Sequence, residues 1–173
     1  MMCLKLALAA GSKIIITSSS DGKLKHVQDM APAGVIQTIN YRTSPNWEDE
    51  VIRLNGGVEV DLVVENGGMS SIVQSLKAVT KGGTISQVGY LGKQNTDDLT
   101  GFVSLLIDKT ANLRGINVGS RRDFERLNNF IATTGLRFED IVHRVYPVEH
   151  IQDALDTLQS GSHIGKIIVT MGS

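Results

Sequence analysis

A run of hydroxyl side chains follows the first apolar segment of the sequence. Lys13–Thr17 contains three consecutive isoleucines, which predicts a buried strand, and Ser18, Ser19, Ser20 and Asp21 come directly after it. Ligands of open α/β sheets lie at the carboxyl ends of the strands. These side chains are therefore candidates for contact with the ribose of a nucleotide.

The same strand end predicts a choice between two dinucleotides. A strand that binds NAD usually ends in a carboxylate, which accepts the ribose hydroxyls and repels a 2′-phosphate. Here Ser18 and Ser19 stand at that place, while Lys23 and Tyr41 supply a positive charge and a phenol for the phosphate. We therefore expect NADP (NADPH) as the cofactor. Two alternatives stay open: Lys23 as a solvated helix lysine, and Asp21 as the ribose acceptor of NAD.

Three further strand ends carry small residues that suit a planar ligand. They are Asn66-Gly67-Gly68, Gly89-Tyr90 and Val118-Gly119-Ser120. Where side chains are small, the backbone amides and carbonyls can reach the polar edges of such a ligand. The alternative is that the glycines only turn a strand into a loop. Four such ends in one sheet favour a binding site.

Metal ligands and catalytic nucleophiles are not recognisable at any characteristic spacing. The four histidines, His26, His143, His150 and His163, form no H-x-x-H or H-E-x-x-H pattern, and Cys3 is distant from all of them. The sequence also holds no G-x-S-x-G elbow and no phosphate loop. We therefore predict no zinc in this chain and assign no catalytic residue.

The composition excludes several classes of partner. Hydrophobic residues make up 41% and charged residues 20% of the 173 positions, which suits one globular domain with a sizeable core. The net charge of -1, with both signs interspersed, argues against nucleic acid and against a membrane surface as partners. The single cysteine indicates a reducing compartment, and the apolar core of Met1–Ala10 is too short for a signal peptide. The expected location is the cytoplasm.

Helices and strands alternate along the sequence, with short links that contain glycine. Helices are predicted over 1–10 and 24–30, from Ser44-Pro45 onward, after a cap at Ser70, and over 101–109, 123–133 and 149–160. Strands are predicted over 13–17, 35–41, 60–64, 84–88, 113–118 and 166–170. This alternation predicts an α/β fold with a doubly wound, Rossmann-like parallel sheet and helices on both faces. Strand 60–64 is apolar enough to be covered on both faces.

In such a fold, a first strand and a G-x-G-x-x-G turn should precede the strand over 13–17. Neither is found before Lys13 in the sequence. The expected domain is therefore a Rossmann-like sheet that lacks its first strand and its Gly-rich loop.

Six stretches, taken together in their order and spacing, resemble the medium-chain (zinc-type) alcohol dehydrogenase and quinone reductase superfamily. They are Ala9–Asp21, Ile39–Thr43, Val60–Glu65, Gly82–Ile85, Leu113–Arg121 and Gly165–Val169. The resemblance covers nearly the whole chain. It implies a partial NAD(P)-binding domain over 1–173, truncated at the N-terminus, with the catalytic GroES-like domain of the family absent.

The resemblance also implies a role for each strand end. The adenosine end of the cofactor would lie at Ser18, Ser19, Lys23 and Tyr41, its middle at Asn66 and Gly67, and its nicotinamide at Gly89, Tyr90, Val118, Gly119 and Ser120. Hydride would pass between the nicotinamide and a carbonyl or alcohol in the intact parent, and this chain alone would be inactive.

The family's strand at Leu113–Val118 often pairs across a homodimer, so a homodimer is also implied. Two alternative functions stay open. One is a non-catalytic interaction module that dimerises through this strand. The other is a methyltransferase that uses S-adenosylmethionine, since an apolar strand with an acidic end occurs there too.

Overall fold

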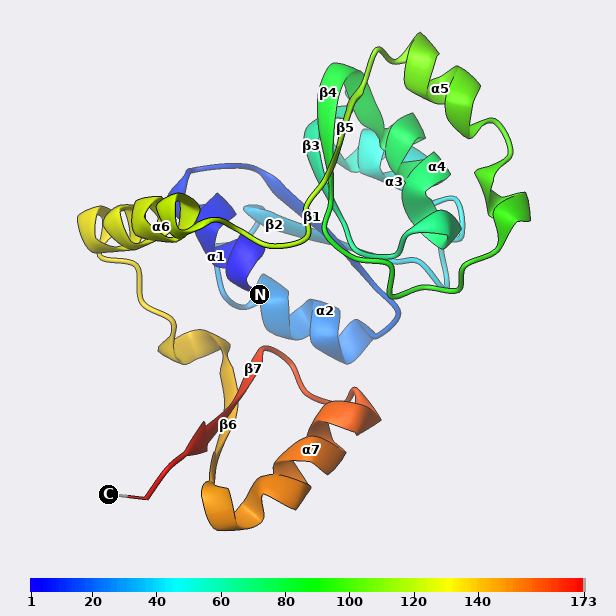
Figure 1. The fold of residues 1–173 in the computed structure, drawn as a ribbon. Helices are drawn as coiled ribbons and strands as arrows, with labels where there is room; N and C mark the ends of the chain where they lie inside the picture. Colours follow the sequence, from blue (N-terminus) through cyan, green and yellow to red (C-terminus); the bar gives the residue numbers. More distant parts are fainter. Residues whose placement is uncertain (173) are drawn as a thin grey trace. The chain divides into compact units, whose positions relative to one another are not determined.

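The computed structural model of the protein describes residues 1–172 and divides into two units of an α/β fold (Figure 1). The continuous unit is Ile15–Arg122. The discontinuous unit joins Met1–Ile14 to the chain from Asp123 onward.

The continuous unit follows the predicted alternation of strands and helices. Its elements are β1 (Ile14–Ser18), α2 (Asp21–Gln28), β2 (Ile36–Asn40), α3 (Trp47–Leu54), β3 (Val60–Glu65), α4 (Met69–Ala78), β4 (Val79–Gln87), the 3-10 turn η1 (Thr96–Leu99), α5 (Phe102–Asp108) and β5 (Asn112–Gly115). Strand β1 pairs with β2, while β3, β4 and β5 form a separate parallel sheet. In that sheet Ile85 lies opposite Val63 on one side and Leu113 on the other.

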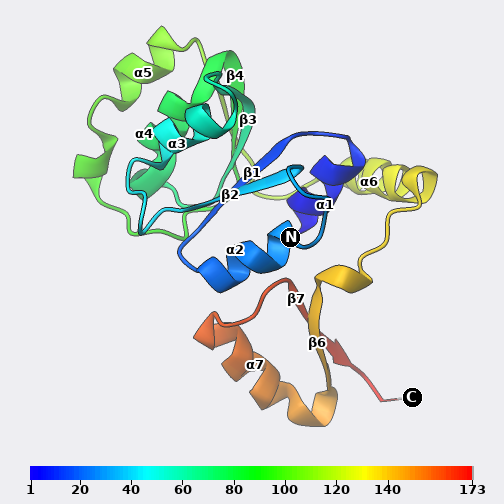
Figure 2. The same ribbon diagram turned by 180° about the vertical axis from the view of Figure 1, so that it is seen from behind.

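Helices α3, α4 and α5 gather on one side of the β3-β4-β5 sheet in both views (Figures 1 and 2). Leu76 of α4 and Ile85 of β4 are fully buried there, and Val63 of β3 packs against them. The alternate residues of β3, Leu62 and Val64, are 57% and 39% exposed. The prediction that this strand is covered on both faces is therefore wrong, because the helices packed on this sheet lie on one face.

A second core connects the two sheets of the continuous unit. It consists of Ile39 on β2, Val51 on α3 and Ala78 at the end of α4, with Trp47 and Val60 packed against it. Strands β1 and β3 are not hydrogen-bonded neighbours. The β1-β2 pair is therefore attached to the β3-β4-β5 sheet by side-chain packing rather than by strand pairing.

Helix α3 begins at Trp47, later than the predicted start at Ser44-Pro45. The backbone N of Ser44 donates a hydrogen bond to Asn40 O at 2.9 Å, which places Ser44 in a turn after β2. The carbonyl of Pro45 accepts a hydrogen bond from Gln74 Nε2 at 2.7 Å. The turn at Ser44 and the tertiary contact of Pro45 with Gln74 together account for the later helix start, and the local sequence does not reveal the tertiary contact.

A buried carboxylate joins α3 to α4. Glu48 is 4% exposed, and it accepts hydrogen bonds from Gln74 Nε2 at 2.6 Å and from Lys77 Nζ at 3.0 Å. Burial raises the pKa of Glu48, but hydrogen bonds from its own backbone amide, Lys77 and Gln74 outweigh this effect. The pKa of Glu48 therefore lies below its ordinary value.

We expect Glu48→Gln to lower the free energy of unfolding by about 1–3 kcal/mol at pH 7 and by much less at pH 3. Because the folded-state pKa lies below the unfolded-state pKa, the stabilisation is complete above the unfolded-state value. It is lost as the pH falls through the folded-state value. Urea unfolding at a series of pH values, followed by the fluorescence of Trp47, measures this difference.

The matched control is Glu50→Gln on the same helix, where Glu50 pairs with Arg53 at the surface. This variant should change stability little at any pH. Equal losses in the two variants, or a loss in Glu48→Gln that does not depend on pH, would contradict the role of Glu48.

The discontinuous unit is built around a β-α-β motif. Its elements are α1 (Met2–Ala9), α6 (Arg121–Thr134), the 3-10 turns η2 (Glu139–Ile141) and η3 (Val148–His150), β6 (Val142–Pro147), α7 (Ile151–Ser160) and β7 (Lys166–Thr170). Strands β6 and β7 are parallel. Lys5 Nζ on α1 lies 2.6 Å from Asp140 Oδ2, which ties the first helix to the late part of the chain.

Candidate functional site

The ends of β1 and β2 bring several of the predicted residues together. Ser20 caps α2, and its hydroxyl accepts a hydrogen bond from the backbone N of Lys23 at 3.4 Å. The backbone N of Tyr41 donates to Ser18 O at 3.1 Å. Ser18, Ser19, Lys23 and Tyr41 thus lie at the ends of these two strands and in the first turn of α2. We call this group the serine edge.

The carboxylate of Asp21 is held by a residue to which sequence reasoning gave no role. Asn40 Nδ2 donates a hydrogen bond to Asp21 Oδ1 at 2.7 Å, and Asn40 Oδ1 accepts one from Arg42 N at 3.0 Å. Asn40 is the last residue of β2, and a polar residue at a strand end was the available signal. Asp21 would have to give up this contact, or share it, to bind a ribose.

A buried carboxylate lies beneath the loop after β3. Glu65, the last residue of β3, is 5% exposed, and its Oε1 accepts hydrogen bonds from Gly67 N at 2.6 Å and Gly68 N at 3.3 Å. The hydroxyl of Ser71 donates to Oε1 at 2.7 Å, and the hydroxyl of Ser75 donates to Oε2. From the sequence, Glu65 is the last residue of a stretch that resembles the family, and no binding role is predicted for it. An acidic residue at the end of an apolar strand was the only local signal.

This contact corrects the predicted start of α4. The helix begins at Met69 after Gly68, and the side chain of Ser70 is not its cap. The first amides of a helix have no partner within the helix, and Glu65 supplies an acceptor just ahead of α4. The carboxylate thus fixes the two residues that precede α4, and Gly68 rather than Ser70 stands at the N-terminal cap.

The loops after β3 and β4 are hydrogen-bonded to each other. Leu91 N donates to Asn66 O at 2.8 Å, and Gly92 N donates to Gly67 O at 2.9 Å. The predicted residues Asn66, Gly67, Gly89 and Tyr90 are therefore brought together. We call residues 66–69 and 88–94 the joined loops.

Gln94 fastens the joined loops, and sequence reasoning missed it. Its Nε2 donates to Gly67 O at 3.0 Å and to Tyr90 O at 3.1 Å, and its Oε1 accepts from Met69 N at 3.1 Å. Gly68 has φ +85°, and a Cβ there would lie 2.8 Å from Gln94 Oε1. A glycine is therefore required at this position. No sequence pattern marks a glutamine that acts 25 residues away.

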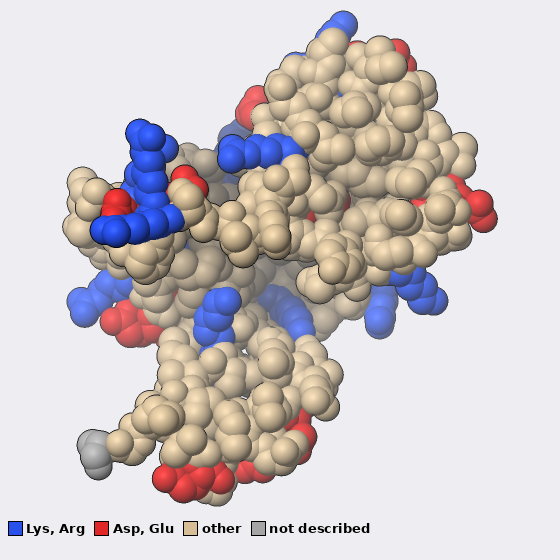
Figure 3. Space-filling view, in the orientation of Figure 1, with Lys and Arg blue, Asp and Glu red and all other residues tan. Residues whose placement is uncertain are grey.

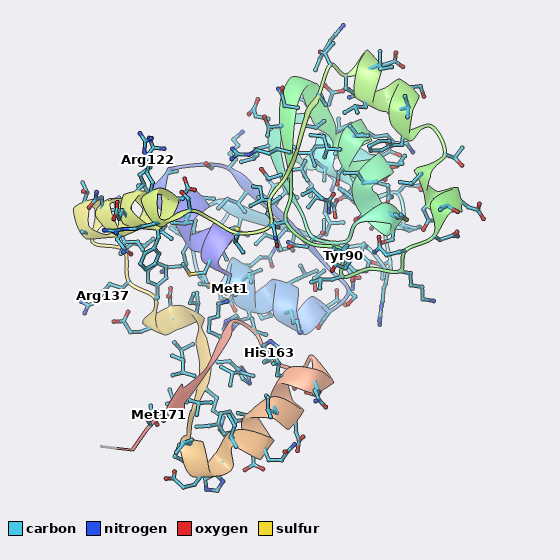
Figure 4. All side chains as sticks on the ribbon, in the orientation of Figure 1. Met1, Tyr90, Arg122, Arg137, His163 and Met171 are labelled. Atoms are coloured by element: carbon cyan, nitrogen blue, oxygen red, sulfur yellow. The ribbon has the colours of Figure 1, made fainter. Side chains whose placement is uncertain are left out.

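Two side chains of the joined loops are exposed. Tyr90 is 80% exposed on the loop that follows β4 (Figure 4). The exposed side-chain amide of Asn66 makes no hydrogen bond within residues 1–172. A ligand at this strand edge would meet an aromatic ring and an amide with donor and acceptor atoms available.

The predicted site residues Val118, Gly119 and Ser120 lie beyond β5 rather than at its end. Strand β5 ends at Gly115, and Ile116 N adds one hydrogen bond to Gln87 O at 2.9 Å. Val118 is 81% exposed. The strand predicted over 113–118 therefore ends earlier in the structure, and Val118, Gly119 and Ser120 belong to the loop that follows it.

The described residues do not offer a zinc site. Within residues 1–172 no group of three or more His, Cys, Asp or Glu side chains is placed to hold a metal ion. The rings of His143 and His163 meet edge to face, with centroids 6.3 Å apart, and His150 Nδ1 lies 3.0 Å from Asp153 Oδ2. The absence of zinc stays a prediction.

Charged side chains of both signs are scattered over the face shown in Figure 3, and no single basic area dominates it. None of the helices formed by residues 1–172 combines the length and the apolar character that a membrane span requires.

The parallel β3-β4-β5 sheet, with helices between its strands and loops of asparagine and glycine after β3 and β4, defines the chain as a Rossmann-like nucleotide-binding fold. Residues 1–133 match the family of zinc-binding dehydrogenases, and the chain belongs to this family. The resemblance to zinc-type alcohol dehydrogenases is thereby confirmed, and so is the predicted fold class.

Individual relatives agree with this assignment. The chain is 33% identical over 167 residues to a zinc-type alcohol dehydrogenase-like protein of Schizosaccharomyces pombe, which covers 96% of this chain and 47% of that protein. It is 30% identical over 138 residues to an NADP-dependent isopropanol dehydrogenase of Entamoeba histolytica, with coverage of 78% and 37%.

A crystal structure described as an alcohol dehydrogenase from Sinorhizobium meliloti 1021 superimposes with a TM-score of 0.82 at 31% identity. The match covers 97% of this chain and 46% of that one. The chain thus spans about half the length of the curated relatives it matches first.

Proposed function

We propose that the chain is the NADP-binding part of an alcohol dehydrogenase-like oxidoreductase. The observation that supports the proposal is the serine edge, where Tyr41 is bonded to Ser18, Lys23 stands in the first turn of α2, and the carboxylate of Asp21 is bonded to Asn40. A 2′-phosphate meets hydroxyls, a phenol and a lysine there. The NADP dependence of the Entamoeba histolytica relative supports the same choice.

The joined loops would hold the rest of the dinucleotide. Asn66 offers its side-chain amide to the middle of the cofactor, and Gly67 and Gly89 let the backbone approach it closely. Tyr90 and the segment Val118–Ser120 belong to the loops that follow β4 and β5, and we expect the nicotinamide there. The bound cofactor would supply hydride transfer to or from a carbonyl or alcohol.

The residues that activate such a substrate are proposed to lie in the half of the relatives that this chain does not match. Three observations support this proposal: the chain spans about half of those proteins, no metal-binding cluster is present within residues 1–172, and no catalytic acid is recognisable. The isolated chain is then inactive. A homodimer through the exposed edge strand β5 is part of the same proposal.

Titration with NADPH and NADH tests the proposed function. We expect wild-type protein to prefer NADPH, and Lys23→Ala to weaken NADPH binding about tenfold or more while NADH binding hardly changes. Only NADPH carries the extra phosphate, and added salt should reduce the preference by screening the contact. Isothermal calorimetry or the fluorescence of the reduced nicotinamide gives both affinities.

Lys25→Ala is the matched control, since Lys25 lies on the same helix and pairs with Asp29 at the surface. It should leave both affinities unchanged. If wild-type protein prefers NADH, Asp21 is the acceptor of the ribose hydroxyls and the proposal of NADP as the cofactor is wrong. If Lys23→Ala weakens the binding of NADPH and NADH equally, Lys23 does not recognise the 2′-phosphate specifically.

A further inference from the structure

Glu65 is a buried carboxylate whose partners are all neutral. Its four hydrogen bonds come from the amides of Gly67 and Gly68 and from the hydroxyls of Ser71 and Ser75. Within residues 1–172 it forms no ion pair with Lys, Arg or His. A buried charge without a countercharge is costly, so these donors must hold it in place.

Two of those donors, the amides of Gly67 and Gly68, come directly before α4, where a helix ordinarily binds an external anion. Free amides and the helix dipole at an N-terminus attract phosphate and carboxylate groups. Ahead of α4, however, the amides of Gly67 and Gly68 are taken by Glu65, and the amide of Met69 is taken by Gln94. The position of an anion is already filled from within the chain.

The carbonyls of the same loop are also engaged. Asn66 O and Gly67 O accept hydrogen bonds from Leu91 N and Gly92 N, so the backbone of the loop has little left to offer a ligand. Asn66 carries the polar side chain of residues 66–69, and this side chain is exposed.

We propose that Glu65 is a positioning residue that acts as the built-in anion of helix α4. Its carboxylate fixes the loop over residues 66–69, excludes other anions from the start of α4 and directs Asn66 toward the middle of the bound dinucleotide. The second half of this statement rests on the proposed function, whereas the first half concerns the chain alone.

Chemical rescue tests the built-in anion. Glu65→Ala should lower the midpoint of thermal unfolding by about 5 °C or more, because several buried donors lose their acceptor. Acetate or formate at about 100 mM should restore several degrees of this loss, since a small carboxylate can refill the vacated position. Wild type in acetate and the variant in sodium chloride of equal ionic strength should not be stabilised in this way.

A conservative variant separates charge from shape. Glu65→Gln keeps an acceptor of nearly the same size, so it should unfold between wild type and Glu65→Ala and respond weakly to acetate. If Glu65→Ala does not fold, Ser75→Ala with Glu65 retained gives the second measurement, as it removes one donor and should lower the midpoint without creating a response to acetate. Equal responses to acetate and chloride in Glu65→Ala, or in Glu65→Gln, would overturn the built-in anion.

Two nucleotide probes test the positioning role. Adenosine 2′,5′-bisphosphate reaches the serine edge only, whereas NADPH also extends past Asn66. Glu65→Gln should weaken NADPH about tenfold and leave the bisphosphate unchanged, and Asn66→Ala should do the same without changing the unfolding midpoint. Equal weakening of both probes by Glu65→Gln would show a merely structural role and reject the proposal. If wild type binds neither probe, the proposed function fails, while acetate rescue still decides whether Glu65 is the built-in anion.

Discussion

Replacing Gly165 with alanine is expected to destabilise the discontinuous unit by about 3–5 kcal/mol or more. Gly165 precedes β7 with φ +93°, a conformation that side chains other than glycine rarely adopt. A Cβ at this position would lie 2.1 Å from Ile141 O and 2.9 Å from Ile141 C. Both atoms belong to the backbone, so the clash can be relieved only if the end of η2 or the start of β7 moves.

Gly161→Ala is the matched control. Gly161 ends α7 with φ +62°, but a Cβ there would have no atom within 4 Å. The only cost in this variant should be the backbone strain of alanine at positive φ, which lowers the free energy of unfolding by about 1–2 kcal/mol. Urea unfolding followed by far-ultraviolet circular dichroism, together with the rate of proteolysis after Asp123, measures both variants. If the free energy of unfolding falls equally in the two variants, the backbone near Ile141 can move to relieve the clash with little loss of stability.

Leu76→Ala is expected to destabilise the continuous unit by about 2–5 kcal/mol. Leu76 on α4 has no exposed surface and packs with Ile72, Val79 and Ile85 between the helices and the β3-β4-β5 sheet. Alanine would leave a cavity that α4 cannot close, because Glu65 holds the start of this helix. The fluorescence of Trp47, the single tryptophan, reports on the continuous unit during urea unfolding.

Leu62→Ala serves as the control for Leu76→Ala. Leu62 is also a leucine of the continuous unit, but it lies on the uncovered face of β3 and is 57% exposed. Leu62→Ala should lower the free energy of unfolding by well under half as much as Leu76→Ala. A loss at Leu62 as large as at Leu76 would indicate that the outer face of β3 is covered in solution.

The order of the elements could be predicted from the sequence because each one carries its own local signal. The apolar run at Ile14 and the strand over Lys166–Thr170 are recovered nearly to the residue. The covering of β3 could not be predicted in the same way. Apart from Asp61 and Glu65, the strand Val60–Glu65 is apolar, and periodicity cannot tell a strand covered on both faces from one whose Leu62 and Val64 remain exposed.

Some residues of the candidate site could likewise be predicted from the sequence, and others could not. The residues at strand ends, such as Ser18, Asn66 and Tyr90, are found by their place in the expected sheet. Glu65 and Gln94 are not, since each acts through contacts that form only when distant loops meet. A carboxylate at a strand end and a glutamine in a loop are common residues, and only the folded chain shows what they hold.

The discontinuous unit has a consequence for the order in which the chain can fold during synthesis. Residues 15–122 are complete before the second part of that unit exists, and Lys5 must wait for Asp140, 135 residues further along. At ribosomal speed this delay is roughly 7–30 s. Throughout it, the first helix, with its buried Leu4, lacks the contact of Lys5 with Asp140. The nascent chain should therefore expose α1 to chaperones until its last third has emerged.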